Sequence, residues 1–517
     1  MGNRILWVDD EADFLRPHII FLENNGYKVD VVYSGEDALE MIQKNTYELI
    51  FLDQNMPGID GLSLNKEIKA INPNINIVMI TKTQDIDLIN SAIGANIDDF
   101  IVKPINSYQL LSIVKKYIDS WKIKKDSLIS NYTMDYPNLD IDIYNSTFDD
   151  WVNLYLRVIH WDTQIIENNE EEIKQMHEEK KRELNDKFTF YIIKNYLKWI
   201  NDESEDAPTT SVDIFVEYIE PYLEVKKKVF FLLLDCLRLD QWIFIKNILK
   251  EKFIIKDDYY LSLLPSSTPF SRNAIFAGLY PIEIFRRHPE IWDFETEENM
   301  GMNTYEEELF SLQLKLFGYD TSKMKFLKIY SNTAYHKMFD EIKTYADKYD
   351  IIAAVFTFID KLSHEIRNSS ILIELVNDEY GYVNLTKAWF EASILRRVIE
   401  YLGEKGFTII VTTDHGSVWG KRPLKIEGGR NISRNLRYKH GSVFYTDTKK
   451  AFIIERPEEY KLPVKTQDFK YVLATNDYYF VYPSNYNIYK KYYQNSIYHG
   501  GISMEELILP ISILEYK

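Results

Sequence analysis

The sequence predicts a multidomain α/β protein in which two parallel sheets are joined by a helical connector. Near the N-terminus, apolar runs alternate with amphipathic helical patterns, which is typical of a doubly wound parallel sheet. The last part of the chain has near-continuous apolar runs, which are typical of strands buried on both faces of a mostly parallel sheet. Large apolar residues at helical spacing lie between these regions. We therefore expect domains over 1–120, 121–205 and 206–517.

Length and composition limit the class of protein. The 517 residues suffice for about three domains, and the single cysteine, Cys236, excludes an intramolecular disulfide and fits a reducing compartment. A net charge of −18 argues against binding duplex DNA through its phosphates. No apolar run approaches the ~18 residues that span a bilayer, and the first residues lack the pattern of a secretory signal. The sequence predicts a soluble, cytoplasmic protein without membrane insertion.

The first domain is expected to contain five strand–helix pairs. In chain order, the predicted pairs are 4–9 with a helix to about residue 25, 28–32 with 35–44, 48–53 with 61–70, 75–81 with 83–94, and 98–104 with 107–118. Functional residues in such sheets gather at the carboxyl ends of the strands.

Polar side chains end several of these strands. Asp9 and Asp10 end the first strand, and Asp53 ends the third. Thr81 and Lys103 end the fourth and fifth. Carboxylates that converge at one rim repel each other unless a cation lies between them, and Mg²⁺ prefers such oxygen ligands. A lysine and a hydroxyl nearby suit a phosphoryl group on one of the acids. The alternative, simple solvation of strand ends, explains any one of these residues but poorly explains all of them together.

This segment resembles the receiver domain of bacterial response regulators over residues 1 to about 120. The resemblance implies that Asp53 is the phospho-acceptor of a sensor histidine kinase. It also implies a Mg²⁺ site formed by three carboxylates and one backbone group: Asp9, Asp10, Asp53 and Asn55. The residues that respond to the phosphoryl group would be Thr81, Lys103 and Phe100.

The connector, 121–205, is predicted to be helical. Large apolar residues recur at helical spacing in 149–165 and 188–200. The Glu- and Lys-rich stretch 167–187 predicts a solvated helix with i,i+4 charge pairs, or a coiled-coil edge. The stretch 201–210 then has the composition of a linker. The connector either transmits the state of the first domain or acts as a passive spacer.

Three apolar runs in the last domain each end in an aspartate. The runs "KVFFLLLD", "DIIAAVFTFID" and "FTIIVTTD" end at Asp235, Asp360 and Asp414. Parallel strands place their ends on one rim, so these carboxylates are expected to converge. The histidines that accompany them are His364, His415 and His499. Aspartate with histidine suits Zn²⁺ or Mn²⁺, and six ligands suit two ions ~4 Å apart. Taken alone, "DHG" also reads as an ordinary turn.

Thr268 is the candidate nucleophile. It ends the extended segment "LLPSST", and Pro269 can begin a helix as its first residue. A hydroxyl at a helix N-terminus is well placed to become an anion, and coordination to a metal lowers its pKa further. A capping role alone is the alternative. Candidate contacts to a phosphate or base, each with an ordinary packing alternative, are Arg272, Asn273, Arg437, Lys439 and His440.

These segments resemble the alkaline phosphatase superfamily and, within it, the PglZ domain, over about 206–517. The resemblance implies two zinc ions per chain and a threonine, Thr268, that bridges them and attacks phosphorus. One ion would be bound by Asp360, His364 and His499, and the other by Asp235, Asp414 and His415. The region 420–450 is expected to form a cap or insertion.

A receiver joined through helices to a PglZ domain resembles the PorX-type response regulators. That resemblance implies a zinc-dependent phosphodiesterase that acts on nucleotides or oligonucleotides, is paired with a PorY-like sensor histidine kinase, and regulates type IX secretion. We expect phosphorylation to favour a homodimer. The alternative is a non-catalytic signalling scaffold with a structural metal site, which acts by binding a sigma factor or secretion components.

Overall fold

The computed structural model describes residues 3–82, 97–168, 170–292, 304–329, 332–376, 378–429 and 435–517. The chain forms two compact units, Met1–Met134 and Asp135–Lys517. The second unit contains most of the predicted connector together with the predicted catalytic domain. The helix predicted over 83–94 lies outside the described residues.

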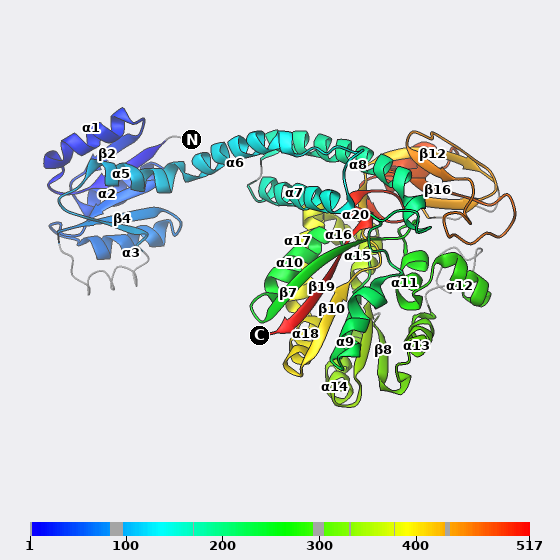
Figure 1. The fold of residues 1–517 in the computed structure, drawn as a ribbon. Coiled ribbons are helices and arrows are strands. Elements are labelled where there is room, and N and C mark those ends of the chain that lie inside the picture. Colours follow the sequence, from blue (N-terminus) through cyan, green and yellow to red (C-terminus); the bar gives the residue numbers. More distant parts are fainter. Residues whose placement is uncertain are drawn as a thin grey trace. The chain divides into compact units, whose positions relative to one another are not determined.

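The first unit is a parallel sheet in the order β2-β1-β3-β4-β5, drawn in blue in Figure 1. This order confirms the predicted doubly wound sheet. Its strands are β1 (Arg4–Val8), β2 (Lys28–Val32), β3 (Leu49–Asp53), β4 (Asn76–Thr81) and β5 (Asp99–Val102). Its described helices include α1 (Arg16–Asn24), α2 (Gly35–Lys44), α3 (Gly61–Ile71) and α5 (Ser107–Val114).

Local sequence signals explain these elements. β3 is buried at every position, as expected for the central strand of a sheet that helices cover on both faces. Ser34, Asp60 and Asn106 cap α2, α3 and α5, because each side chain accepts a hydrogen bond from a backbone N–H of the first turn. The buried apolar strands and the capped helices therefore fix the positions of the strand ends, which form one rim of the sheet.

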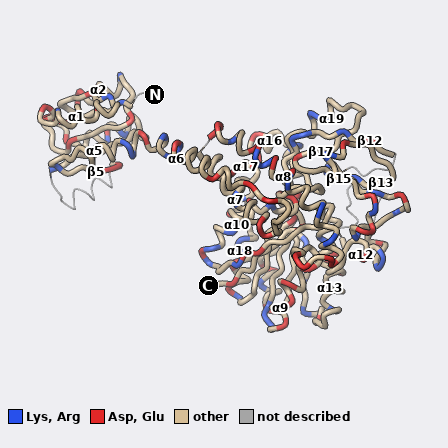
Figure 2. The backbone as a smooth tube through the Cα atoms, turned by 45° about the horizontal axis from the view of Figure 1, so that its top comes forward, with Lys and Arg blue, Asp and Glu red and all other residues tan. Residues whose placement is uncertain are grey.

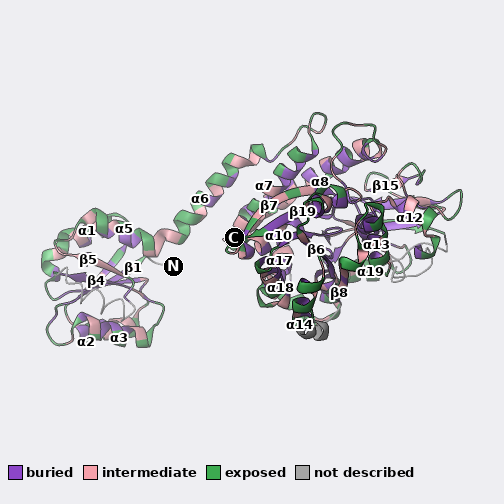
Figure 3. Cartoon of the chain, turned by 60° about the horizontal axis from the view of Figure 1, so that its bottom comes forward, coloured by how far each residue is buried: buried purple, intermediate pink, exposed green. Residues whose placement is uncertain are grey.

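The connector contributes two long helices to the second unit. After a π-helical turn, η2 (Lys115–Asp119), and α6 (Ser120–Asp135), the helices α7 (Phe148–Glu167) and α8 (Glu171–Trp199) pack on each other. The predicted charged and apolar stretches form one continuous helix, α8. Acidic and basic residues lie close together around α8 in Figure 2, yet buried residues also line it in Figure 3.

The charged half of α8 has the predicted i,i+4 charge pairs, Glu178 with Arg182 and Glu183 with Lys187, but it also carries buried residues and so is not solvated on all sides. His177 is 2 % exposed and Lys180 7 % exposed, and Leu184 is fully buried. Long lysine side chains can bury their aliphatic stems when acids pair with their ammonium groups, and charge composition alone does not reveal this.

The larger sheet of the second unit has the strand order β7-β19-β10-β6-β9-β8 (Figure 1). β10, β6, β9 and β8 run parallel, and β19 is antiparallel to both β10 and β7. The sheet is thus mostly parallel, as predicted, with one reversed strand. The strands are β6 (Lys228–Leu234), β7 (Phe253–Leu261), β8 (Met324–Ile329), β9 (Ile351–Phe356), β10 (Phe407–Thr412) and β19 (Ile508–Tyr516).

Helices surround this sheet. They are α9 (Glu220–Glu224), α10 (Leu239–Leu249), α11 (Thr268–Ala277), α12 (Pro281–Arg287), α13 (Glu306–Leu316), α14 (Asn332–Lys348), α15 (Phe358–Glu365), α16 (Ser370–Leu375), α17 (Glu379–Ala392), α18 (Ile394–Glu404) and α20 (Met504–Leu507). On one face, Phe231 and Leu233 of β6 share a hydrophobic cluster with Phe276 of α11 and Phe310 of α13. Burial of such side chains stabilises the fold by roughly 1.5–3 kcal/mol each.

A β-rich region follows β10 and is drawn in orange tones in Figure 1. The insertion predicted over 420–450 is the first part of this region, which continues to β18. Its elements are β11 (Val418–Gly420), β12 (Arg422–Gly428), β13 (Tyr438–Gly441), β14 (Phe444–Thr446), β15 (Ala451–Ile454), β16 (Lys470–Ala474), β17 (Tyr478–Val481), α19 (Tyr486–Tyr493) and β18 (Ser496–Tyr498).

Candidate metal centres and catalytic site

The rim of the first unit gathers acids around one lysine. One carboxylate oxygen each of Asp9, Asp10 and Asp53 lies within 4.8 Å of the others. The Nζ of Lys103 lies 2.9 Å from Asp9 Oδ2 and 2.9 Å from Asp53 Oδ1. Burial raises the pKa of Asp53, although the hydrogen bond from Lys103 opposes this shift. The donor set is all oxygen and partly buried, which fits a Mg²⁺ ion.

The other predicted residues of this rim lie on neighbouring segments. Thr81 ends β4 and is buried, and its carbonyl accepts a hydrogen bond from the backbone N–H of Lys103. The backbone of Asn55 forms a hydrogen bond with Asp53. Phe100 lies in β5 and packs against a small cluster with Met79. The strand ends thus bring the acids and Lys103 together, and Thr81 lies on the strand beside them.

A first triad in the second unit lies at the ends of two adjacent parallel strands. Asp235 follows β6, and Asp414 and His415 follow β10. The Nε2 of His415 lies 3.9 Å from Asp235 Oδ1 and 3.7 Å from Asp414 Oδ2. All three residues are buried, and we call them the inner triad.

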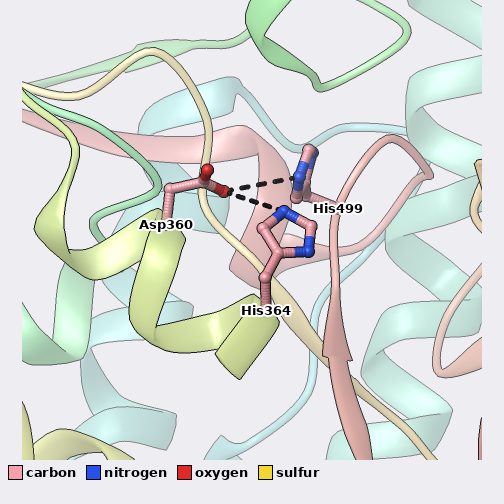
Figure 4. A group of neighbouring side chains, drawn as sticks. All are labelled: Asp360, His364 and His499. Carbon is pink, nitrogen blue, oxygen red and sulfur yellow. Dashed lines mark ion pairs between the residues drawn. The ribbon is translucent and has the colours of Figure 1, made fainter. Parts of the chain in front are cut away.

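A second triad, which we call the outer triad, lies beside it. Asp360 and His364 lie one turn apart on α15, and His499 follows β18. The Oδ1 of Asp360 lies 3.4 Å from His364 Nε2 and 3.7 Å from His499 Nε2 (Figure 4). The rings of His499 and His415 stack with centroids 4.1 Å apart, so the two triads adjoin. The outer triad is more open, since the His364 side chain is 58 % exposed.

Thr268 lies against the inner triad. It is the first residue of α11, after an extended Ser267 and before Pro269 at the start of the helix. Its Oγ1 lies 3.0 Å from His415 Nε2, and the residue is only 8 % exposed. The hydroxyl therefore sits at a helix N-terminus beside a potential metal ligand, an arrangement that stabilises an oxyanion.

Arg272 supplies positive charge among the acids of the inner triad. Its guanidinium pairs with Asp235, and its Nε lies 2.9 Å from Asp414 Oδ2. Burial raises the pKa of the Asp235 carboxyl well above its usual range, Arg272 opposes this shift, and Asp414 adds to it. Two unpaired carboxylates at this depth would be costly, and the Arg272 guanidinium offsets part of that cost.

The outer triad has the properties of a metal site. Burial lowers the pKa of His499 well below its usual value, which keeps the imidazole neutral and able to coordinate. Burial disfavours the charge of Asp360, but the neighbouring histidines, foremost His364, outweigh it and lower the pKa. The Oδ1 atom of Asp360 and the Nδ1 atom of His499 are both buried, and Asp360 Oδ1 faces the two imidazoles. One carboxylate with two imidazoles fits Zn²⁺.

The predicted substrate contacts are buried, and the structure gives them protein partners. Asn273 donates a hydrogen bond to the Pro269 carbonyl within α11. Arg437 is fully buried in an ion pair with Glu506 and donates to the Tyr478 carbonyl. The Arg437 guanidinium therefore supports the segment after His499, and this differs from the predicted substrate contact.

Lys439 and His440 lie on opposite faces of β13. The Nζ of Lys439 lies 4.8 Å from the Tyr482 ring centroid, and the His440 ring stacks on Phe469. Burial lowers the pKa of Lys439 to about 7 and that of His440 to about 4. Lys439 is fully buried and His440 is 8 % exposed, so both belong to the packed interior of the β-rich region.

Comparison with protein families identifies three segments. The model described as the BREX system PglZ alkaline phosphatase-like domain matches 214–513, which is more than half of the chain. The response regulator receiver domain matches 5–115, and the PorX response regulator linker domain matches 122–200. The chain belongs to the PglZ family. The order receiver, PorX linker and PglZ domain is that of a PorX-type response regulator.

Individual relatives are similar to only part of this PglZ-family chain. Response regulator MprA of Mycobacterium ulcerans is 28% identical over 145 residues, which is 28% of this chain and 61% of MprA. Response regulator ArlR of Staphylococcus saprophyticus is 36% identical over 113 residues, which is 22% of this chain and 51% of ArlR. The chain thus spans less than two thirds of these relatives. A solved response regulator of Clostridium difficile is 32% identical, with a TM-score of 0.22, and the match covers 22% of this chain and 95% of that one.

Some contacts of the PglZ site are not apparent in the sequence. Arg272, which the sequence suggests as a substrate contact, pairs with Asp235 and Asp414 of the inner triad. Glu505 and Glu506 follow His499 closely in "HGGISMEE", and nothing in that stretch signals their buried roles. None of the described helices is long and apolar enough to cross a membrane.

Proposed function

We propose that the chain is a two-component response regulator whose PglZ domain is a zinc-dependent phosphodiesterase acting on nucleotides or oligonucleotides. The single observation that carries this proposal is the 3.0 Å separation between Thr268 Oγ1 and Nε2 of His415, whose ring stacks on His499 of the outer triad. A hydroxyl in this position is shielded from bulk water and faces ligands suited to two zinc ions. A purely structural metal site does not require a buried hydroxyl at its centre.

The chain's own residues would perform the following steps. When bound, two zinc ions supply positive charge for the phosphoryl oxygens and lower the pKa of the Thr268 hydroxyl. Thr268 Oγ attacks phosphorus, the bond to the leaving alkoxide breaks, and the alkoxide takes up a proton. Water then hydrolyses the phosphothreonine, which releases a phosphate monoester and restores Thr268. Arg272 stabilises Asp235 and Asp414 as carboxylates throughout.

Control of this activity would come from the receiver. A PorY-like sensor histidine kinase would phosphorylate Asp53, with Mg²⁺ at Asp9 and Asp10 and with Lys103 and Thr81 contacting the phosphoryl oxygens. Phosphorylation would favour a homodimer and so regulate type IX secretion from the cytoplasm. This part of the proposal is supported by the receiver match and by the lysine–carboxylate cluster of the rim.

The test is turnover of bis(p-nitrophenyl) phosphate and of short oligonucleotides by the purified protein. Thr268→Ala should lower kcat by at least about 10³-fold, because the nucleophile is absent. Thr268→Ser keeps a hydroxyl at the same place and serves as the matched control, with a measurable residual rate. A Thr268→Ala variant as active as the parent would refute the nucleophile.

The alternative, a non-catalytic scaffold that binds a sigma factor or secretion components, makes a different prediction. In that case the secretion phenotype would survive Thr268→Ala and disappear with Asp53→Ala. The two roles can also coexist, and the turnover assay measures catalysis independently of the phenotype.

A further inference from the structure

We propose that Arg367 and the tyrosine-rich helix α19 form a binding subsite for a nucleobase beside the outer triad. This inference rests on the proposed nucleotide phosphodiesterase function and assigns it a specificity-determining surface. The subsite lies outside the residues that the sequence singled out.

Arg367 joins the two segments that carry the outer triad. It follows His364 by three residues, in the short helix η8 (Ile366–Asn368) that continues α15. Its Nη1 donates a hydrogen bond of 3.1 Å to the hydroxyl of Tyr498, the residue directly before His499. A positive charge is therefore fixed next to the open side of the outer triad.

Tyrosine rings surround this guanidinium. Its central carbon lies 5.4 Å from the ring centroids of Tyr492 and Tyr493, and 5.5 Å from that of Tyr498. Tyr489 stacks on Tyr493 with centroids 5.7 Å apart and an angle of 13° between the rings. The Tyr498 hydroxyl donates to the Tyr493 carbonyl at 2.7 Å, so α19 is tied to the strand that leads to His499. The aromatic group is thus connected to both segments that carry the outer triad, through Arg367 and through Tyr498.

Two of these rings face solvent. Tyr489 is 40 % exposed and Tyr492 is 57 % exposed, whereas Tyr498 is buried. Exposed tyrosines on an ordered helix are surfaces on which bases stack, at low cost in side-chain entropy. The base beside the reacting phosphate is the base that lies nearest to the two triads. A stacking surface joined through Arg367 and Tyr498 to the segments that carry His364 and His499 suits that base.

The charge of this surface favours an anionic ligand. The helix sequence "YNIYKKYY" contains Lys490 and Lys491, both exposed, and no acid, in a chain of net charge −18. With Arg367, these lysines offer positive charge to backbone phosphates on either side of a stacked base. Aromatic faces interleaved with cations are what single-stranded nucleic acid binding uses. We therefore assign the surface to a single-stranded nucleotide chain.

The test is a binding assay that needs no turnover. The full-length Thr268→Ala protein is titrated against two fluorescent eight-residue DNA strands of equal charge, an oligothymidylate and an abasic analogue, and Kd is measured by fluorescence anisotropy. We expect the oligothymidylate to bind at least about tenfold more tightly than the abasic strand. Adding Tyr489→Ala and Tyr492→Ala should remove this preference. Adding Tyr445→Ala, which alters a tyrosine 69 % exposed on β14, should leave it unchanged.

The outcomes separate the two proposals. Equal affinity for both strands, no measurable binding, or an undiminished preference in the double variant would each overturn the subsite. A double variant that keeps the preference but no longer dimerises would assign the tyrosines to a protein interface instead. If the preference is present but the parent protein hydrolyses no phosphodiester, the subsite stands and the catalytic proposal fails.

Discussion

Asn185 of α8 binds the segment that follows His499 at two points. Its Oδ1 accepts a hydrogen bond of 2.8 Å from the Met504 backbone N–H, and its Nδ2 lies 3.1 Å from Glu505 Oε2. On the same helix, the Tyr196 hydroxyl accepts a hydrogen bond from the Leu264 N–H, in the loop that leads to Thr268. A helix of the predicted connector thus supports both the loop that leads to Thr268 and the segment that follows His499. The part of the predicted connector that follows Met134 is therefore a structural part of the second unit.

Replacing Asn185 should destabilise the second unit. Asn185→Leu removes both hydrogen bonds and leaves a buried Glu505 carboxylate and a Met504 N–H with fewer partners, at a cost of about 2 kcal/mol. The cost is measured by urea unfolding followed through intrinsic fluorescence. Asn195→Ala is the matched control, because Asn195 lies on the same helix and, within the described part of the chain, its side chain bonds only to the Tyr191 carbonyl of that helix. Equal midpoints for the two variants would show that Asn185 does not support the loop.

Asp53 should be the site of phosphorylation in the receiver. Incubation with a small phosphoryl donor such as acetyl phosphate and Mg²⁺ should label the parent protein and leave Asp53→Asn unlabelled, as measured by intact mass. Asp60→Asn serves as the control, since Asp60 is the cap of α3 and asparagine can cap equally well. Undiminished labelling of Asp53→Asn would place the acceptor elsewhere.

Much of the candidate site could be predicted because it depends on strand ends. Continuous apolar runs mark buried parallel strands, and β6 and β10 are direct neighbours, so Asp235 and Asp414 necessarily converge. Asp360 is predicted at a strand end, but β9 ends at Phe356 and Asp360 lies on α15, where a spacing of four residues places it on one face with His364. Each of these relationships is local in sequence or follows from the direction of the strands.

The remaining features depend on contacts that no spacing encodes. Asn185 and Glu505 are 320 residues apart, and nothing in either stretch identifies the other. The reversed direction of β19 is equally hidden, since an apolar run does not show which way its strand points. The ion pairs of Arg272 with two aspartates also depend on how α11 packs onto the rim. Arginine beside a candidate nucleophile suggests a substrate contact, and its pairing with Asp235 and Asp414 becomes apparent only in the fold.

The outer triad should lose its ion before the inner triad. The His364 side chain is 58 % exposed, whereas all members of the inner triad are buried. We expect His364→Ala to lower zinc from two ions to about one per chain after dialysis, measured by mass spectrometry of the metal, with loss of turnover. His288→Ala, which changes a histidine paired with Glu290, should keep both ions. Two retained ions in His364→Ala would remove His364 from the ligand set.

Lys439 should make stability depend on pH above neutrality. Burial lowers its pKa from 10.5 to about 7, so between these values the unfolded chain carries a proton that the folded chain does not. The free energy of unfolding should therefore rise with pH from about 7 to about 10, by at most about 1.4 kcal/mol per pH unit. Below pH 7 the contribution of Lys439 should not change with pH. Lys439→Met should flatten the rise, as measured by the unfolding midpoint at each pH. An identical pH dependence in parent and variant would mean that Lys439 is charged in the folded protein.

Gly416 should tolerate no side chain. A Cβ at this position would lie 1.9 Å from the Glu505 carbonyl oxygen, and the Gly416 N–H donates a hydrogen bond of 3.1 Å to the Glu506 carbonyl. Gly416→Ala must therefore push apart the loops of His415 and His499, and we expect a loss of about 3 kcal/mol or more in stability together with weaker metal binding. Gly429→Ala is the matched control, because a Cβ there would meet no atom within 4 Å. If Gly416→Ala and Gly429→Ala both unfold at the same denaturant concentration as the parent, the close contact between these two loops does not position His415.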